Sequence, residues 1–398
     1  MEKKLRILQI NSVCGVGSTG KIAENLYWEY KKQGFECKIA WGRREGGEIP
    51  TQDRIQIGTS KDYLLHALEA RFFDDCGFGS RAATRNFLEK VEKFDPDVIH
   101  LHNLHGYYIN IKYLFRFLSE SKKKVIWTLH DCWPITGHCA HFDYVSCRKW
   151  QANCFSCPLL SSYPKSFFID RSRTNFITKK RLFTSVDDLI LVPVSYWLSD
   201  LLNKSYLCNV HKKVIHNGIN TKIFRPRSSS ITRKYHLEGK RIILGVAFDW
   251  SDKKGLKDFI FLANNLPQTD YQVVLIGIND KQKLQVPHTI ITLPKTNSQE
   301  ELAQWYSEAF VFVNPTYEDN FPTVNLEAQE CGTPVITYDT GGSVESVPKE
   351  NVVPKGDVQG LLQKILSDEL FCKTGWNIQS MTTKYVDLIS KMGIQTVI

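Results

Sequence analysis

Residues 5–30 read LRILQINSVCGVGSTGKIAENLYWEY, which predicts a strand, a glycine-rich turn and a helix in succession. Leu5–Ile10 is a short apolar run of the kind that forms a buried parallel strand. Gly15–Gly20 supplies the turn, and apolar residues at helical spacing follow over Ile22–Tyr30. A strand, a turn and a helix in this order form the first βα unit of a doubly wound sheet.

The same alternation recurs along the chain and predicts an α/β protein with two Rossmann-like domains, 1–207 and 208–376, followed by a helical segment, 377–398. Further strands of the first domain are expected at Cys37–Trp41, Val98–His102, Val125–Leu129 and Leu189–Val194. A second series is expected at Val214–Ile215, Arg241–Ala247, Gln272–Ile276, Thr289–Thr292, Phe310–Val313 and Val335–Thr337. Two doubly wound parallel sheets should face a central cleft, with ligands at the carboxyl ends of the strands.

The composition is that of a folded globular protein, with 42% hydrophobic and 23% charged residues among 398. Apolar runs fall short of the ~18–20 residues that a membrane span needs. No secretory signal is expected, so we predict a cytoplasmic location. The net charge of +9 is uneven, because residues 1–207 hold 30 basic and 22 acidic side chains. This excess fits an anionic membrane surface or a nucleic acid as partner, and equally an ordinary solubility charge.

The glycine-rich turn admits two interpretations. Gly15–Lys21 has the spacing of a nucleoside-triphosphatase loop, but Ile22 stands where Ser or Thr must bind magnesium. We therefore favour a turn that lets backbone N–H groups at a helix N-terminus approach a ligand.

Histidines cluster after two predicted strands. His100, His102 and His105 come close together without a carboxylate, so packing or hydrogen bonding is favoured over a metal site. His130 and Asp131 follow the strand at 125–129, where they suit hydrogen bonding or proton transfer. A buried histidine with satisfied hydrogen bonds explains His130 equally well.

Four cysteines lie within a short segment: Cys139, Cys147, Cys154 and Cys157. Without a secretory signal, free or metal-bound thiols are favoured over disulfides. A Cys-x-x-Cys pair with two further thiols suits a structural zinc site. Because the spacing is not that of a standard zinc finger, free thiols, disulfides and an iron–sulfur cluster stay open.

Loops suited to phosphate follow two predicted strands of the second domain. The loop Asp319–Thr323 precedes a helix, so its backbone N–H groups can face an anion. Glu327, about one turn into that helix, can accept hydrogen bonds from two ribose hydroxyls. Lys253 and Lys254 stand at the start of another helix, where two ammonium groups suit a diphosphate.

These stretches resemble the glycosyl transferases group 1 family, which are retaining enzymes with the GT-B fold. The resemblance covers essentially the whole chain and rests on HNGINTKIF (216–224), DKKGLKDF (252–259), EDNFPTVNLEAQECGTPVI (318–336) and TGGSVESV (340–347). In the first domain, HLHNLHGYYINI, TLHDCWPITGHC and CPLLSSYP resemble the subgroup used in bacterial exopolysaccharide, capsule and O-antigen assembly.

The resemblance implies a role for each matching residue of the second domain. It puts the nucleotide ribose on Glu327, hydroxyls of the donor sugar on Asp319 and the leaving diphosphate on Lys254. The family's upstream Arg has no clear counterpart, and Lys253 is the candidate to replace it. The loop against the diphosphate and sugar corresponds to Asn320, Phe321, Pro322 and Thr323.

In the first domain, Gly17 matches a first-loop glycine near the donor phosphate, and His130 matches an active-site histidine near the transferred sugar. The resemblance further implies that this domain binds the acceptor and that the C-terminal helix, 377–398, packs back onto it.

The implied reaction moves a hexose from a UDP- or GDP-linked donor to a lipid-linked saccharide acceptor, with retention of configuration. Lysines and helix N-termini would stabilise the leaving diphosphate, so we expect no catalytic cofactor, and zinc only as a structural ion. A GT-B nucleotide-sugar epimerase is the alternative. A nucleic-acid-binding module is disfavoured, because the chain has no RNA-binding signature. Peripheral attachment to the inner face of the cytoplasmic membrane would use the basic runs Lys122–Lys124 and Lys179–Arg181.

Overall fold

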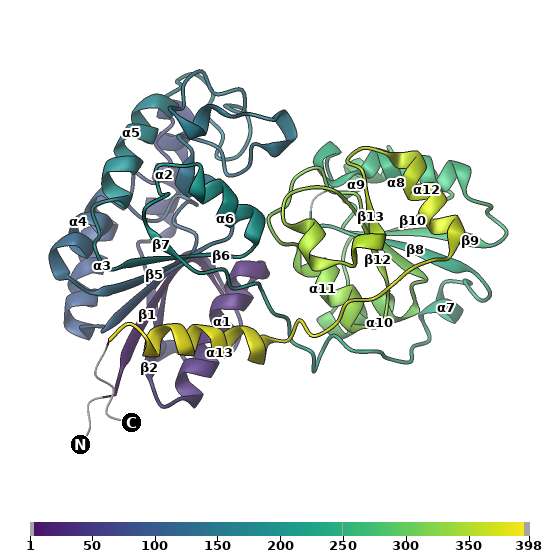
Figure 1. Ribbon diagram of the computed structural model, residues 1–398, viewed down its shortest axis with the longest axis horizontal. Coiled ribbons are helices and arrows are strands. Elements are labelled where there is room, and N and C mark those ends of the chain that lie inside the picture. Colours follow the sequence, from purple (N-terminus) through teal and green to yellow (C-terminus); the bar gives the residue numbers. More distant parts are fainter. Residues whose placement is uncertain (1–3, 249, 394–398) are drawn as a thin grey trace. The chain divides into compact units, whose positions relative to one another are not determined.

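The computed structural model describes residues 4–248 and 250–393 of the chain (Figure 1). Its first strand, β1 (Arg6–Cys14), runs through a turn into α1 (Gly17–Lys32). Gly15 in this turn has a φ of 62°, and a Cβ there would lie 2.4 Å from the carbonyl oxygen of Gly46. The predicted strand, turn and helix are therefore present, and glycine is required where the turn passes the chain after β2 (Glu36–Glu45).

Seven parallel strands form the first sheet, in the order β3-β2-β1-β4-β5-β6-β7. The remaining strands are β3 (Arg54–Gln56), β4 (Val98–Leu101), β5 (Lys124–Leu129), β6 (Leu189–Pro193) and β7 (His211–Lys212). The helices between them are α2 (Ser60–Phe73), α3 (Arg81–Phe94), α4 (Ile111–Ser121), α5 (Ser172–Phe183) and α6 (Tyr196–Asn203).

Six parallel strands form the second sheet, in the order β10-β9-β8-β11-β12-β13. The strands are β8 (Arg241–Val246), β9 (Tyr271–Ile276), β10 (Ile291–Leu293), β11 (Val311–Asn314), β12 (Val335–Tyr338) and β13 (Val352–Val353). The helices are α7 (Ile231–Lys234), α8 (Leu256–Asn265), α9 (Asp280–Lys283), α10 (Gln299–Glu308), α11 (Thr323–Glu330) and α12 (Val358–Ser367). Two doubly wound parallel sheets are thus present, as predicted.

The second series of strands begins later than the sequence predicted. Val214–Ile215 is irregular in structure, whereas β7 precedes it and pairs with β6 at the edge of the first sheet. The compact units accordingly divide after His216 instead of after residue 207. The second unit is Asn217–Ile378, and the first resumes at Gln379.

The C-terminal helix α13 (Ile378–Ser390) packs into the core of the first unit, beside α1 in Figure 1. Tyr385 is fully buried, and its hydroxyl group lies 2.8 Å from that of Thr128 on β5. Four apolar side chains of α13 join the cluster that α1 and β1 form: Met381, Tyr385, Leu388 and Ile389. The end of the chain therefore completes the core of the unit that its beginning forms.

Within 4–248 and 250–393, no helix combines the length and the apolar composition that crossing a membrane requires.

Candidate active site

The order of the strands reverses beside the first strand of each sheet. In the second unit β8 lies between β9 and β11, and in the first unit β1 lies between β2 and β4. Ligands of open α/β sheets bind outside the carboxyl ends of the strands at such a reversal. The loops after β8 and β11, and those after β1 and β4, are therefore the expected ligand-binding loops. The loops after β8 and β11 carry the predicted site residues Lys253, Lys254 and 319–322.

In the second unit, the loops after β8 and β11 are held directly against each other. The first contains the turn Asp252–Lys254 and then Gly255, which has a φ of 73°. A Cβ on Gly255 would lie 2.5 Å from the carbonyl oxygen of Pro315, so a larger residue would push the loops apart. The backbone N–H of Tyr317 donates to the carbonyl oxygen of Lys253 at 2.8 Å. The lysine side chains are thereby placed beside the loop after β11.

Two lysine–carboxylate pairs join these loops. Lys254 Nζ donates to Asp319 Oδ2 at 2.7 Å and to Thr316 Oγ1 at 3.3 Å. Lys253 Nζ donates to Glu318, an acid that the sequence reasoning did not select. The Lys254 and Asp319 side chains remain 35% and 21% exposed, so a ligand can reach both. The structure thus brings two predicted site residues, Lys254 and Asp319, into contact.

The residues after Asp319 form a buried loop that leads into α11. Asn320 and Phe321 are buried, and the Phe321 ring lies edge-on to Trp376 with 5.4 Å between centroids. Pro322 precedes Thr323, the first residue of α11, and its fixed φ suits the entry to a helix. The predicted loop is therefore anchored by packing, with the helix N-terminus at its end.

The two glycines of the TGGSVESV stretch, Gly341 and Gly342, pack against the backbone of Asp319 in this loop. Gly341 has a φ of 53°, and a Cβ on it would lie 2.0 Å from the carbonyl oxygen of Asp319. The backbone N–H of Gly342 donates to the same oxygen at 3.2 Å. Replacing Gly341 would displace the backbone of Asp319, so this glycine positions a site residue.

Glu327 lies in the second turn of α11, half-buried among protein atoms. The hydroxyl of Tyr306 donates to Glu327 Oε2 at 3.3 Å. Burial raises the pKa of Glu327 to about 7, although this hydrogen bond opposes the shift. Further hydrogen-bond donors would stabilise the charged form of this buried carboxylate, and two ribose hydroxyls would supply them.

Sequence reasoning missed the polar network that holds α11 in place. Buried Asn325 accepts a hydrogen bond from Asn314 Nδ2 at 2.8 Å and donates to Ser343 Oγ at 3.2 Å and Ser346 Oγ at 2.9 Å. Gln329 Nε2 donates to the carbonyl oxygens of Asn325 and Ser346. The signal was available, because Asn325, Gln329 and the two serines lie within the motifs that carry the family resemblance. These residues position the helix that carries Glu327.

In the first unit, the glycine-rich turn after β1 ends at Gly17, where α1 begins. Gly17 has a φ of 65°, and a Cβ there would meet no atom within 4 Å, so the turn is open on that side. Lys21 Nζ pairs with Glu24 Oε2 at 2.8 Å. An open turn at a helix N-terminus agrees with the favoured interpretation of this segment.

His130 belongs to a chain of hydrogen bonds with His102 and Gln9 that fixes its tautomer. Gln9 Nε2 donates to the carbonyl oxygen of Ala23, so Gln9 Oε1 accepts from His102 Nε2 at 3.1 Å. His102 Nδ1 must then accept from His130 Nε2 at 3.2 Å, which leaves His130 Nδ1 without a proton. Burial lowers the pKa of His130 to about 4, so its ring is neutral near pH 7. Nδ1 of His130 is therefore a hydrogen-bond acceptor.

The neighbouring Asp131 forms its hydrogen bond with a different histidine, His105. Its Oδ2 accepts from His105 Nε2 at 2.6 Å, and its Oδ1 accepts from the Trp133 backbone N–H at 2.9 Å. Burial acts to raise the pKa of Asp131, but the charge and hydrogen bond of His105 lower it to about 2. His105 Nδ1 also contacts the hydroxyl of Tyr163 at 2.8 Å. Asp131 thus orders the segment after β5 without bonding to His130.

The remaining histidine of the cluster, His100, has structural partners. Its Nε2 lies 2.8 Å from Thr128 Oγ1, and its Nδ1 lies 3.2 Å from the hydroxyl of Tyr30. These contacts agree with hydrogen bonding of His100 and His102, the interpretation that was favoured over a metal site.

The four clustered cysteines line one small cavity, together with His138. Within the described ranges, however, no three His, Cys, Asp or Glu side chains are grouped closely enough to hold a metal ion. The geometry therefore does not support the zinc site that was predicted at Cys139, Cys147, Cys154 and Cys157. Spacing along a chain does not fix where thiols point in a segment with little regular structure.

The two basic runs are only partly open to solvent, because Lys122, Lys180 and Arg181 are exposed and the other three residues are paired or buried. Lys123 pairs with Asp95, and Lys124 Nζ lies 3.1 Å from Asp188 Oδ2. Lys179 is 1% exposed and points inward, where its Nζ donates to the Trp133 carbonyl oxygen at 2.9 Å. A run of lysines in a sequence does not show which of them face the protein interior.

Comparison with known families matches both units. Residues 19–223 match the family described as Glycosyltransferase Family 4, and residues 240–367 match Glycosyl transferases group 1. The putative colanic acid biosynthesis glycosyl transferase WcaC of Escherichia coli (strain K12) is 25% identical over 387 residues, which cover 90% of each chain.

Solved structures show the same fold at low sequence identity. Sucrose-phosphate synthase from Thermosynechococcus elongatus has a TM-score of 0.68 and 16% identity, over 98% of this chain and 99% of that one. HepE of Anabaena, solved in complex with UDP, has a TM-score of 0.61 and 14% identity, over 98% and 100%. With two parallel-sheet domains and these neighbours, the chain has the GT-B fold.

Proposed function

This chain belongs to Glycosyltransferase Family 4, and from that premise we propose that it is a retaining hexosyltransferase of bacterial surface polysaccharide synthesis. The donor is a UDP- or GDP-linked hexose, and the acceptor is a saccharide carried on a lipid. The resemblance to WcaC, which is named for colanic acid biosynthesis, supports the polysaccharide assignment. Neither matching family supports the epimerase alternative.

The observation that carries the proposal is the Lys254–Asp319 pair, 2.7 Å long, beside the strand reversal and the loop that leads to Glu327. A nucleotide sugar needs a cation for its diphosphate, acceptors for its sugar hydroxyls and a carboxylate for its ribose. Lys254, Asp319 and Glu327 supply these three in one unit. The UDP bound to the similarly folded HepE agrees with such a donor.

The transfer breaks the bond between the sugar and the diphosphate, so negative charge grows on the diphosphate as the reaction proceeds. Lys254 and the backbone N–H groups at the start of α11 stabilise this charge without reorganising. The acceptor hydroxyl attacks from the face that the diphosphate leaves, and the departing diphosphate helps to remove its proton. This order of events retains the anomeric configuration and assigns no covalent nucleophile.

His130 contributes as a neutral acceptor. With its Nε2 proton given to His102, its Nδ1 can accept a hydrogen bond from a sugar hydroxyl and orient that sugar. A pKa of about 4 keeps this role unchanged between pH 6 and 8.

The first unit binds the acceptor in this proposal, and the enzyme works in the cytoplasm. Gly17 and His130 keep the roles that the resemblance implies, near the donor phosphate and the transferred sugar. Peripheral attachment to an anionic membrane surface stays a prediction. It rests on the excess of 30 basic over 22 acidic side chains in residues 1–207, since half of the residues in the two basic runs are paired or buried.

A thermal-shift screen of nucleotide sugars tests the donor assignment. Binding to the folded state stabilises it by RT ln(1 + [L]/Kd), so the cognate donor at ~100 times its Kd should add ~2.7 kcal/mol. We expect a shift with one UDP- or GDP-linked hexose and a smaller one with the free nucleotide. An unchanged melting temperature with every UDP- and GDP-linked hexose at millimolar concentration would contradict the assignment.

A further inference from the structure

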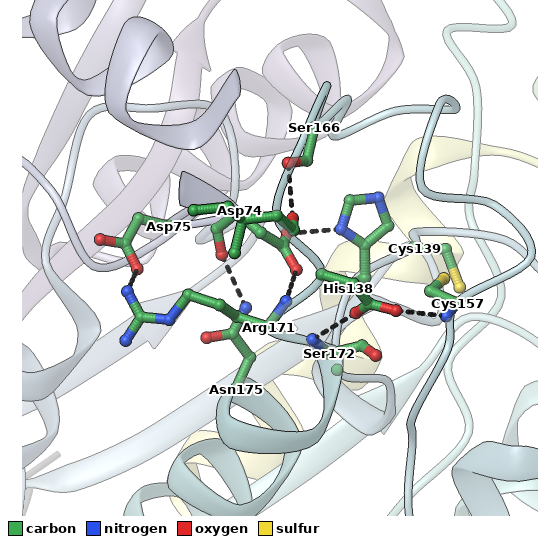
Figure 2. A network of polar contacts seen from close by, with 12 residues as sticks. Asp74, Asp75, His138, Cys139, Cys157, Ser166, Arg171, Ser172 and Asn175 are labelled. Atoms are coloured by element: carbon green, nitrogen blue, oxygen red, sulfur yellow. Dashed lines mark hydrogen bonds and ion pairs between the residues drawn. The ribbon is translucent and has the colours of Figure 1, made fainter. Parts of the chain in front are cut away.

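Two of the clustered thiols touch inside the cavity of the first unit. Cys139 is buried, Cys157 is half-buried, and the Cys139 thiol donates a hydrogen bond to the Cys157 sulfur. Figure 2 shows the two sulfur atoms next to each other and beside His138. Nothing in the proposed transfer reaction uses this pair.

A buried histidine, His138, lines the same cavity as the two cysteines and contacts a buried aspartate, Asp74. His138 Nδ1 and Asp74 Oδ1 are 2.5 Å apart, and the two side chains are 0% and 1% exposed. Burial acts to lower the pKa of His138, but the hydrogen bond and charge of Asp74 together raise it above its usual value. His138 Nε2 is buried and has no hydrogen-bond partner among the described residues. A histidine whose affinity for a proton Asp74 increases thus lies close to Cys157.

Cys157 has the environment of a thiolate. The pKa of Cys157 is lowered to about 7 by the hydrogen bond from the Cys139 thiol, the charge of His138 and the backbone N–H of Leu159. Burial and the charge of Asp170 act to raise this pKa but do not outweigh them. Asp170 Oδ2 accepts from the backbone N–H of Cys157 at 2.6 Å and so fixes the position of this residue. By contrast, the pKa of Cys139 is raised well above its usual value. The two thiols are therefore unequal, as an attacking and a resolving cysteine are.

We propose that Cys157 is a peroxide-reactive thiol and that Cys139 resolves its oxidised form as a disulfide. In the first step, the Cys157 thiolate attacks one oxygen of hydrogen peroxide, the O–O bond breaks, and hydroxide leaves to become water. The product is a sulfenic acid. In the second step, the Cys139 sulfur attacks the Cys157 sulfur, and the S–O bond breaks. The departing hydroxide takes the Cys139 proton as water. Two thiols are oxidised to one disulfide, and the peroxide is reduced to two waters.

The disulfide would cross-link the segment that follows β5 and His130. Thr136 Oγ1 donates to the Cys139 carbonyl oxygen, and the Cys132 backbone N–H donates to Ala140 at 2.8 Å. Oxidation would therefore tie the Cys157 end of this segment to the hydrogen-bonded turn that begins beside His130 and Asp131. A disulfide reduces the conformational freedom of the loop that it closes.

Treatment of the reduced full-length protein with hydrogen peroxide, followed by mass spectrometry, tests the proposal. We expect a loss of about 2 Da and a peptide cross-linked through Cys139 and Cys157, both reversed by dithiothreitol. At pH 7, the ionised fraction of a thiol with a pKa of about 7 is about 16-fold larger than that of an ordinary thiol with a pKa of ~8.5. A thiolate of lower pKa is a weaker nucleophile, which reduces its rate of attack by about fivefold. The pair should thus oxidise about threefold faster than an ordinary thiol, with a rate that rises with pH and levels off above 7.

Three variants separate the roles. Cys139→Ser should stop at the sulfenic acid on Cys157, which dimedone traps. Cys157→Ser should abolish both the cross-link and the dimedone adduct. Cys208→Ser is the matched control, because Cys208 is exposed and outside the cavity, and should leave the cross-link unchanged.

Three results would overturn the proposal. One is oxidation of Cys208 ahead of Cys157, and another is the absence of a Cys139–Cys157 peptide. The third is one equivalent of zinc in the purified protein that must be removed before Cys157 reacts, since the thiols would then be metal ligands.

Discussion

Lys254→Ala is expected to lower kcat by about 100- to 1000-fold while weakening nucleotide-sugar binding far less. The reason is that charge on the diphosphate grows towards the transition state, so the ammonium group stabilises that state more than the bound donor. Lys254 is placed for this by its 2.7 Å contact with Asp319. Steady-state kinetics with the cognate donor, compared with calorimetric binding of the same donor, measures the two effects separately.

Lys257→Ala is the matched control for this variant. Lys257 lies in the first turn of α8, but its side chain is 78% exposed and pairs with Asp252. Both variants remove one positive charge from the same surface, and only Lys254→Ala should lose turnover. Wild-type turnover in Lys254→Ala would remove this residue from the mechanism.

Glu327→Ala is expected to weaken binding of the nucleotide by about 10- to 150-fold. Hydrogen bonds to a charged group contribute about 1.5–3 kcal/mol each, and the ribose would lose its carboxylate acceptor. Isothermal titration with the free nucleoside diphosphate measures the loss. Glu350→Ala, which removes an exposed acid from the same unit, should bind as the wild type does. Equal affinity of Glu327→Ala and wild type would place the ribose elsewhere.

The pH dependence of stability gives an independent test of the environment of Glu327. Because burial raises its pKa to about 7, the folded state binds this proton more tightly than the unfolded chain does. The resulting stability is present below about pH 4.5 and is lost as the pH rises through about 7. Between pH 5 and 8, the free energy of unfolding should therefore fall less in Glu327→Gln than in the wild type. The difference between the two decreases should be up to about 3 kcal/mol.

The regular part of the fold could be predicted because buried parallel strands are short apolar runs. β1, β5, β8 and β12 stand where such runs occur in the sequence. The edge strands β3, β7 and β13 were missed, since they have three, two and two residues and no pattern of their own. The error at β7 moved the domain boundary, because a strand of two residues is defined by its pairing partner and not by its composition.

The donor side of the candidate site was predictable for a different reason. Lys254 and Asp319 lie 65 positions apart, and only the fold brings them together, but each belongs to a motif that the family resemblance identifies. Glu318 and Asn325 were passed over, because their roles are to hold Lys253 and α11 and depend on contacts alone. Side-chain direction explains the other errors. Lys179 of a basic run points into the interior, and the four cysteines share a cavity without forming a metal site.

The most direct test of the account is transfer itself, followed by phosphorus NMR with the cognate donor in the presence of EDTA. Lys254 and the N-terminus of α11 stabilise the charge of the diphosphate, so we expect the reaction to need no metal ion. Because the sugar passes to the acceptor, we expect nucleoside diphosphate to appear only when a saccharide acceptor is added. Its amount should equal the amount of sugar transferred, and EDTA should not lower the rate. Conversion of the donor into an epimer with its diphosphate bond intact, or nucleoside diphosphate release that is independent of acceptor, would contradict the proposed transfer.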